Sequence, residues 1–290
     1  MIRTIEDYID SPQEIKDDTV ILVFGRFQPF TRGHLAMLQD VGRLVKAGYK
    51  NYWIGTSYVD PKKHHSRVTD VMSRKIEREI SKMDLDSDRK RSAEIMRLIK
   101  HKENPFVTDR KVELLKLGAE FAGLKESHVW NDFSGGIVDA IKEAKNLTNV
   151  NRLLLISGPD QASKYQELLD KYNAFGFTAD AYVYSKARET TRVSSEVLGE
   201  IIDSISATKV RYLAVRGRLS QFMDLVPDIF GDHNSRMKLQ LYDDLRDAYY
   251  NMGVPVDNYI PKAKQGGAKK KRQNIKYWLV YNYIINKTKK

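Results

Sequence analysis

The sequence has 290 residues, of which 41% are hydrophobic and 30% charged, and its formal net charge is +11. This composition is typical of a globular protein and excludes a wholly disordered chain, and no run approaches the ~20 apolar residues of a membrane-spanning helix. We therefore expect a cytoplasmic protein that does not contact a membrane. Because the chain contains no cysteine, disulfides, thiolate metal sites and cysteine nucleophiles are excluded.

The positive charge is concentrated in two stretches of the chain. Residues 262–290 hold ten basic and no acidic residues, which leaves a net charge of +1 for the rest. Residues 62–102 hold thirteen basic and seven acidic residues. Since the tail also contains Tyr277, Trp278 and Tyr281, it has the composition that neutralises phosphates and stacks on bases, so nucleic acid is a partner to consider. The alternative is a tail that packs on the body as a final strand or helix.

Apolar periodicity predicts strands and helices that alternate along the chain. Residues 19–24 form a continuous β-branched apolar run before Gly25, typical of a buried parallel strand, and residues 35–45 follow with helical spacing. The other predicted strands cover residues 52–55, 128–130, 152–156 and 181–184. The other predicted helices cover residues 109–117, 137–144, 161–172, 196–203, 208–215, 219–225 and 237–252. This order indicates an α/β fold, a Rossmann-like doubly wound parallel sheet with ligands at the carboxyl ends of its strands.

Two stretches interrupt or extend this alternation. Residues 62–103 are charged and carry apolar residues at helical spacing, which predicts an inserted, solvent-exposed pair of helices. We expect residues 1–231 to form the main domain, residues 232–261 a helical extension, and residues 262–290 a basic, aromatic tail. The predicted fold therefore carries a helical insertion and a small C-terminal extension.

The loop between the first strand and its helix carries the strongest chemical signal, Gly25-Arg-Phe-Gln-Pro-Phe-Thr-Arg-Gly-His34. Gly25 and Gly33 let a ligand approach the backbone, and the start of the helix offers free N–H groups and a positive dipole end. These features predict a phosphate site, to which Thr31 and His34 would present a hydroxyl and an imidazole. The alternative is a tight turn in which Thr31 only caps the helix.

This loop resembles the (H/T)xGH signature of a nucleotidyltransferase superfamily, and it is most similar to the GRFQPFHxGH form of nicotinamide-nucleotide adenylyltransferases. Thr31 stands at the first histidine of that form, as in pantetheine-phosphate adenylyltransferases. A similar layout occurs in phage-encoded members, which would act in the host cytoplasm. The resemblance covers residues 19–227. It implies an enzyme that transfers a nucleoside monophosphate, expected to be AMP from ATP, to a phosphate-bearing small-molecule acceptor and releases pyrophosphate.

Three other segments resemble motifs of this family in the same order. Residues 104–111, Asn-Pro-Phe-Val-Thr-Asp-Arg-Lys, are similar to its NPFxxxxR/K segment. Residues 157–161, Ser-Gly-Pro-Asp-Gln, are similar to its GxDQ turn at a strand end, although such residues also form ordinary β-turns. Residues 205–211, Ile-Ser-Ala-Thr-Lys-Val-Arg, match its ISxTxxR signature, whose hydroxyls and arginine would grip the outgoing phosphates at a helix start.

The resemblance implies roles for residues of these segments. His34, Thr31 and Arg211 are expected to be catalytic. The residues expected to bind the nucleotide are Gly25, Arg26, Phe27, Gly33, Gly158, Asp160, Ser206 and Thr208. The Gly-Arg-Phe-Gln-Pro-Phe and Asn-Pro-Phe sequences favour nicotinamide mononucleotide as acceptor, which would place the enzyme in NAD biosynthesis. Pantetheine-phosphate adenylyl transfer and cytidylyl transfer are the alternatives, and the oligomeric state stays open.

Metal and acceptor-ring sites are less clearly marked. Mg²⁺ is expected to arrive with ATP and to be held mainly by the nucleotide and water. No protein-bound transition metal is expected, because the adjacent His64 and His65 point apart and no ligand cluster has suitable spacing. Trp53 or Trp130 could stack on a flat acceptor ring, or both could pack in the core. A function of a different class is an adaptor that keeps this fold and binds nucleic acid or protein through residues 262–290.

Overall fold

The computed structural model describes residues 4–59, 67–131, 133–178, 180–185 and 206–259. The strands are β1 (Thr19–Gly25), β2 (Asn51–Thr56), β3 (Arg152–Ser157) and β4 (Asp180–Ser185). The helices are α1 (Ile5–Ile9), α2 (Gln13–Asp17), α3 (Arg32–Lys46), α4 (Asp70–Ser81), α5 (Ser87–His101), α6 (Thr108–Phe121), α7 (Ile137–Leu147), α8 (Pro159–Lys171), α9 (Ala207–Val215), α10 (Leu219–Leu225) and α11 (Asn234–Asn251), with 3-10 turns η1 (Glu126–His128), η2 (Asn173–Gly176) and η3 (Gly231–His233). The predicted helix 196–203, His64, His65 and the tail 262–290 lie outside the described residues.

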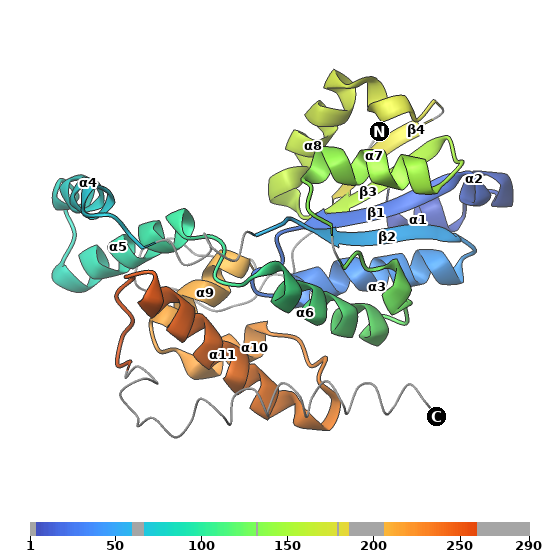
Figure 1. Cartoon of the computed structure of the whole chain (residues 1–290). Coiled ribbons are helices and arrows are strands. Elements are labelled where there is room, and N and C mark those ends of the chain that lie inside the picture. Colours follow the sequence, from blue (N-terminus) through green and yellow to red (C-terminus); the bar gives the residue numbers. More distant parts are fainter. Residues whose placement is uncertain (1–3, 60–66, 132, 179, 186–205, 260–290) are drawn as a thin grey trace. The chain divides into compact units, whose positions relative to one another are not determined.

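The four strands form one parallel sheet in the order β2-β1-β3-β4. Val23 of β1 lies opposite Ile54 of β2 and Ile156 of β3. Helices cover both faces of the sheet (Figure 1), so the predicted α/β, Rossmann-like doubly wound fold is confirmed. The chain runs from β1 to β2 on one side and continues to β3 and β4 on the other, so the strand order reverses between β1 and β3. Ligands of such sheets bind at the carboxyl ends of the strands next to this reversal.

Alternate residues of β1 pack against opposite helical layers. Ile21 and Val23 belong to the apolar cluster that includes the buried residues of α3 and α6. Val20, Leu22 and Phe24 belong to a second cluster, which includes the buried residues of α7 and Leu169 of α8. This period of two is the side-chain alternation of a strand with both faces covered, and it explains why β1 reads as a continuous apolar run.

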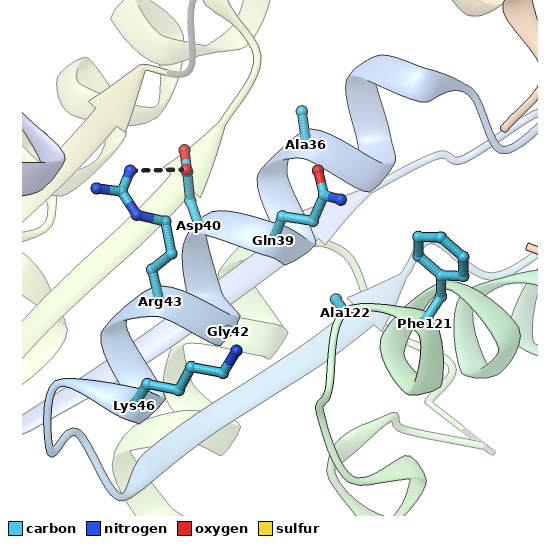
Figure 2. A pocket seen from close by; sticks show the side chains of 8 residues that line it. All are labelled: Ala36, Gln39, Asp40, Gly42, Arg43, Lys46, Phe121 and Ala122. Atoms are coloured by element: carbon cyan, nitrogen blue, oxygen red, sulfur yellow. Dashed lines mark ion pairs between the residues drawn. The ribbon is translucent and has the colours of Figure 1, made fainter. Parts of the chain in front are cut away.

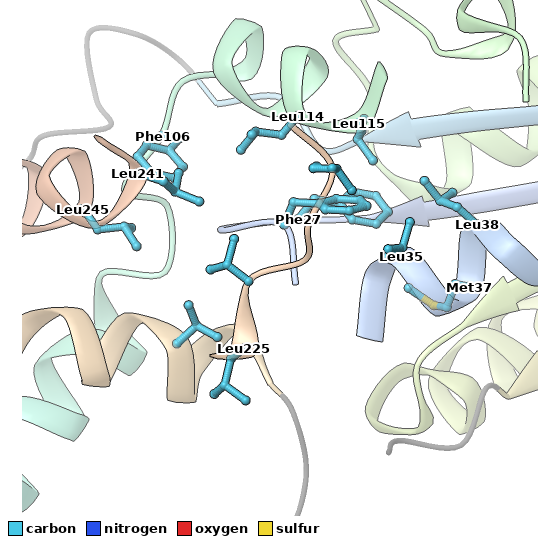
Figure 3. Packing of buried hydrophobic residues seen from close by; sticks show 14 of the residues in the cluster. Phe27, Leu35, Met37, Leu38, Phe106, Leu114, Leu115, Leu225, Leu241 and Leu245 are labelled. Carbon is cyan, nitrogen blue, oxygen red and sulfur yellow. The ribbon is translucent and has the colours of Figure 1, made fainter. Parts of the chain in front are cut away.

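The C-terminal helices share the first of these clusters. Buried residues of α9, α10 and α11 pack with those of α3 and α6, and Figure 3 shows Phe27, from the loop after β1, among side chains of α3, α6, α10 and α11. The compact unit Met1–Val256 therefore contains both the sheet and these helices, and a second unit begins at Asp257. None of the helices within the described residues is both long and apolar enough to cross a membrane.

The predicted pair of helices in residues 62–103 is present as α4 and α5, but it is not simply solvated. Ile95, Leu98 and Ile99 of α5 are buried in the same cluster as α9, and Ile76 and Ile80 of α4 are buried as well. The apolar spacing is visible in the sequence, but the charged residues of each helix favoured a solvent-exposed pair, and only the packing shows that the stripe is buried.

The structure differs from the sequence-based prediction at one predicted strand and at two short helices. Residues 128–130 do not form a strand, because Val129 makes only an isolated parallel bridge with Ile54 after the 3-10 turn η1. Helices α1 and α2 were not predicted. Each has only five residues, too few for a helical apolar period, and α1 begins at a capping box between Thr4 and Asp7.

Candidate active site

The loop after β1 ends in a reciprocal cap at the start of α3. Thr31 is the N-cap residue: its hydroxyl accepts the backbone N–H of His34 at 3.4 Å, and its own N–H donates to His34 Nδ1 at 3.0 Å. A histidine thus replaces the usual Glu or Gln of a capping box. These two hydrogen bonds show that Thr31 has the capping role that the sequence left open. The side chain of Thr31 is only 2% exposed.

This cap determines which nitrogen of His34 carries a proton. A backbone N–H can only donate, so Nδ1 must accept, and the neutral imidazole carries its proton on Nε2. The rings of Phe27 and Phe30 contact the imidazole, with centroid distances of 4.8 and 5.8 Å. His34 therefore carries its Nε2–H in a fixed orientation at the first turn of α3, in which Gly33 also lies and whose N–H groups have no intrahelical partner.

The two phenylalanines are supports of His34 within the core. Both are 1% exposed, so Phe27, which was predicted to bind the nucleotide, presents its ring to His34 and the core. A Cβ at Gly25 would lie 3.2 Å from the ring of Phe27, and a Cβ at Gly118 of α6 would lie 2.4 Å from Cζ of Phe30. Gly118 is a positioning residue that sequence analysis missed, because its partner lies far away in the chain.

Arg211 of α9 is buried and holds the same loop. Its Nη1 donates to the backbone carbonyl of Gln28 at 2.6 Å, and its Nη2 donates to the hydroxyl of Thr208 at 3.0 Å. Nε has no hydrogen-bond partner, and burial lowers the pKa of Arg211 with no carboxylate among the described residues to offset it. The hydroxyl of Ser206 caps α9 by accepting the N–H of Lys209 at 3.2 Å. A buried cation with an unpartnered N–H favours an anion nearby.

Two further cations are linked to Arg211 one after the other: Arg26 lies close to Arg211, and Lys111 lies close to Arg26. Arg26 forms an ion pair with Glu103, and both side chains are partly exposed. Lys111 of α6 is fully buried, and its amine donates to the backbone carbonyl and, at 3.3 Å, to the hydroxyl of Ser57. Burial and the charge of Arg26 lower the pKa of Lys111 to about 7, and burial and the charge of Arg211 lower the pKa of Arg26. Lys111 stands at the R/K position of the segment that resembles NPFxxxxR/K, but sequence analysis gave it no individual role.

The segment that resembles NPFxxxxR/K is attached to the same loop through one side chain. Nε2 of Gln28 donates to Oδ1 of Asn104, and Oε1 of Gln28 accepts the backbone N–H of Phe106, both at 2.9 Å. Gln28 is 1% exposed, so these bonds are shielded from water. The structure therefore brings residues 104–111, the loop after β1 and Arg211 together.

The end of β3 supplies a second helix start at this edge of the sheet. Gly158 is the N-cap of α8 without a side-chain cap, and a Cβ on it would meet nothing within 4 Å. Asp160 lies in the first turn of α8, where N–H groups lack intrahelical partners. Tyr165 of α8 lies close enough to Arg26 for that charge to lower its pKa, although burial raises the pKa more.

The two tryptophans lie against each other beside β2. Trp53 and Trp130 are stacked at 5.7 Å, and Trp130 also stacks on Phe133 at 4.8 Å. A Cβ at Gly55 would lie 2.5 Å from the indole of Trp130. These contacts favour the packing role over the stacking of a ligand ring on Trp130.

A cavity of about 450 Å³ lies elsewhere, between the outer side of α3 and the end of α6 (Figure 2). Its lining residues are Ala36, Gln39, Asp40, Gly42, Arg43, Lys46, Phe121 and Ala122. None of them is a predicted site residue, and Arg43 and Asp40 are paired with each other at 3.8 Å. Within the part of the chain that the structure describes, no group of three or more His, Asp or Glu side chains could hold a metal ion.

No protein-family model matches the sequence, and no curated protein matches it. The resemblance to nucleotidyltransferases therefore rests on the quoted motifs, and the function it implies stays a prediction.

Proposed function

We propose that the protein is a nucleotidyltransferase that transfers AMP from ATP to a phosphate-bearing small molecule and releases pyrophosphate. The observation that carries this proposal is the gathering of Arg26, Lys111 and Arg211 around the loop that holds His34. The starts of α3 and α8 point to the same edge of the sheet, where strand order reverses. Several positive charges and free N–H groups at one edge suit a polyphosphate.

The reaction needs no nucleophile from the protein. An oxygen of the acceptor phosphate attacks the α-phosphorus of ATP, the bond to the α,β-bridging oxygen breaks, and its electron pair leaves with pyrophosphate. His34 would donate its Nε2–H to the α/β-phosphate region, and Arg26 would contact the phosphate chain. Arg211, Ser206 and Thr208 would stabilise the leaving group or hold the loop that does so. Positioning and fixed positive charge then supply the rate enhancement.

The position of Thr31 bears on the acceptor. In the structure its hydroxyl and N–H are used to orient His34, which supports a positioning role rather than a direct contact with the acceptor. We propose nicotinamide mononucleotide as acceptor, with pantetheine phosphate as the second choice. Magnesium would enter with ATP, since the mostly cationic side chains around this loop suit phosphates rather than a cation. A cytoplasmic location is part of the proposal.

A direct assay tests this function. The full chain is incubated with Mg²⁺, each nucleoside triphosphate and one of several phosphorylated acceptors, and products are identified by mass spectrometry alongside released pyrophosphate. We expect ATP and nicotinamide mononucleotide to give NAD. The His34→Ala variant, purified identically, controls for a contaminating enzyme. Absence of product and of pyrophosphate with every pair would refute the proposal.

The second candidate is nucleic-acid binding through the tail, favoured by the ten basic residues in 262–290. The compact unit ends at Val256, so a chain truncated after Asn258 retains it whole. If the tail binds nucleic acid, the logarithm of the binding constant of the full chain should fall linearly with the logarithm of the salt concentration. Truncation should remove this binding and leave the rate of nucleotidyl transfer within about threefold. Full-length protein that shows no salt-dependent retention of RNA or DNA rules this candidate out.

A further inference from the structure

Lys111 is linked to the loop after β1 through the end of β2. Its amine donates to the carbonyl and the hydroxyl of Ser57. The backbone N–H of Ser57 in turn donates to the carbonyl of Gly25 at 3.3 Å, and the hydroxyl of Thr56 donates to the carbonyl of Arg26 at 3.4 Å. A change at Lys111 therefore reaches the residues that begin the loop.

The charges around Lys111 are unfavourable to a buried ammonium. The positive charge of Arg26, in the loop after β1, acts on Lys111. Arg26 is itself close to Tyr165 of α8 and Arg211 of α9 and is paired with Glu103. Among the described residues no carboxylate forms an ion pair with Lys111, whose partners are both neutral oxygens of Ser57. A lysine with a purely structural role would gain more from a carboxylate partner or from replacement by an apolar side chain. A polyanion bound at Arg26 would offset the repulsion between the positive charges of Arg26 and Lys111.

We propose that Lys111 is a positioning and specificity-determining residue that holds the end of β2 and adds a positive charge behind Arg26, so that the site prefers a polyphosphate chain to a single phosphate. This inference rests on the polyphosphate-binding part of the proposed function. It does not require that the acceptor or the nucleobase has been identified correctly.

The test uses the full chain and two probes, inorganic tripolyphosphate and orthophosphate, titrated calorimetrically. Lys111→Met removes the charge at similar length, and Lys116→Met on the same helix is the matched control. We expect Lys111→Met to weaken the tripolyphosphate Kd about tenfold and the orthophosphate Kd about threefold or less. Lys116→Met should change neither. Thermal melts establish that each variant is folded.

Lys111→Arg provides a second measurement if Lys111→Met does not fold. The guanidinium of Lys111→Arg stays charged at both pH values, whereas Lys111 loses its proton as pH rises. The affinity of Lys111→Arg for tripolyphosphate should therefore exceed that of the wild type at about pH 8.5 and equal it at about pH 6. Equal affinities of Lys111→Met and Lys116→Met, or parallel pH profiles of wild type and Lys111→Arg, overturn the inference. If the wild type does not bind tripolyphosphate, this inference fails, and the product assay decides separately on the proposed function. If Lys111 governs binding but no nucleotide product forms, only the proposed function fails.

Discussion

Arg211 donates a hydrogen bond of 2.6 Å to the backbone carbonyl of Gln28, across 183 positions of the chain. The bond ties the middle of α9 to the loop between β1 and α3. The side chain of Gln28 binds Asn104 and Phe106 at the same time. Three segments with family-like motifs therefore meet at one residue to which sequence analysis assigned no role.

We predict that Arg211→Lys impairs both folding and activity. An ammonium has no planar fork, so it cannot bond to Gln28 and Thr208 together. Loss of one charged hydrogen bond in the core should lower the free energy of unfolding by about 2 kcal/mol, measured by urea denaturation. Pyrophosphate release should fall by about tenfold or more.

Arg218→Lys is the control for that change, because Arg218 is exposed just before α10. It should leave both measurements unaltered. Unchanged pyrophosphate release by Arg211→Lys would remove Arg211 from the site.

For His34→Ala we expect kcat to fall by roughly 10² to 10⁴, because one preoriented donor beside the phosphates is lost. Binding of ATP should weaken only modestly. His101→Ala, at the exposed end of α5, serves as the matched histidine control and should retain full activity. A His34→Ala enzyme with kcat within about threefold of the wild type contradicts the role given to His34.

Gly118→Ala tests whether the core positions His34. The new methyl group would lie 2.4 Å from Cζ of Phe30, so the ring of Phe30, which packs on the imidazole of His34, must shift. We expect a loss of about 1–3 kcal/mol in the free energy of unfolding, together with a lower kcat. The double variant Gly118→Ala with Phe30→Leu should recover part of both losses in a double-mutant cycle. Additive effects would show that the two residues do not act through each other.

Lys111 should make stability depend on pH. Its pKa is lowered to about 7 in the folded chain, whereas an unfolded lysine titrates near 10.4. Between these values the unfolded chain binds more protons, so the free energy of unfolding contributed by this group rises with pH. Urea denaturation should show that the free energy of unfolding of the wild type, relative to that of Lys111→Met, is larger at about pH 9.5 than at about pH 7. A constant difference between the two proteins at both pH values would refute this.

Local patterns in the sequence predict the four strands of the sheet and most of the longer helices. The apolar runs at 19–24 and 152–156 predict β1 and β3, and the loop ending at His34 marks the start of α3, because strands, caps and turns depend on neighbouring residues. The alternation of these elements is enough to predict a doubly wound parallel sheet, since crossovers between parallel strands have one preferred hand. The glycines of the loop and the helix that follows predict a phosphate site there, and this site stays a prediction.

Tertiary packing decided how the candidate site is supported. The burial of Lys111, the space that Phe30 requires at Gly118 and the bond from Arg211 to Gln28 each join residues that lie far apart in the chain. The apolar stripe of α5 is likewise buried because α4 and α9 pack against it. Whether a charged or small residue is buried depends on which segment covers it, and a pattern read along one segment carries no information about that partner.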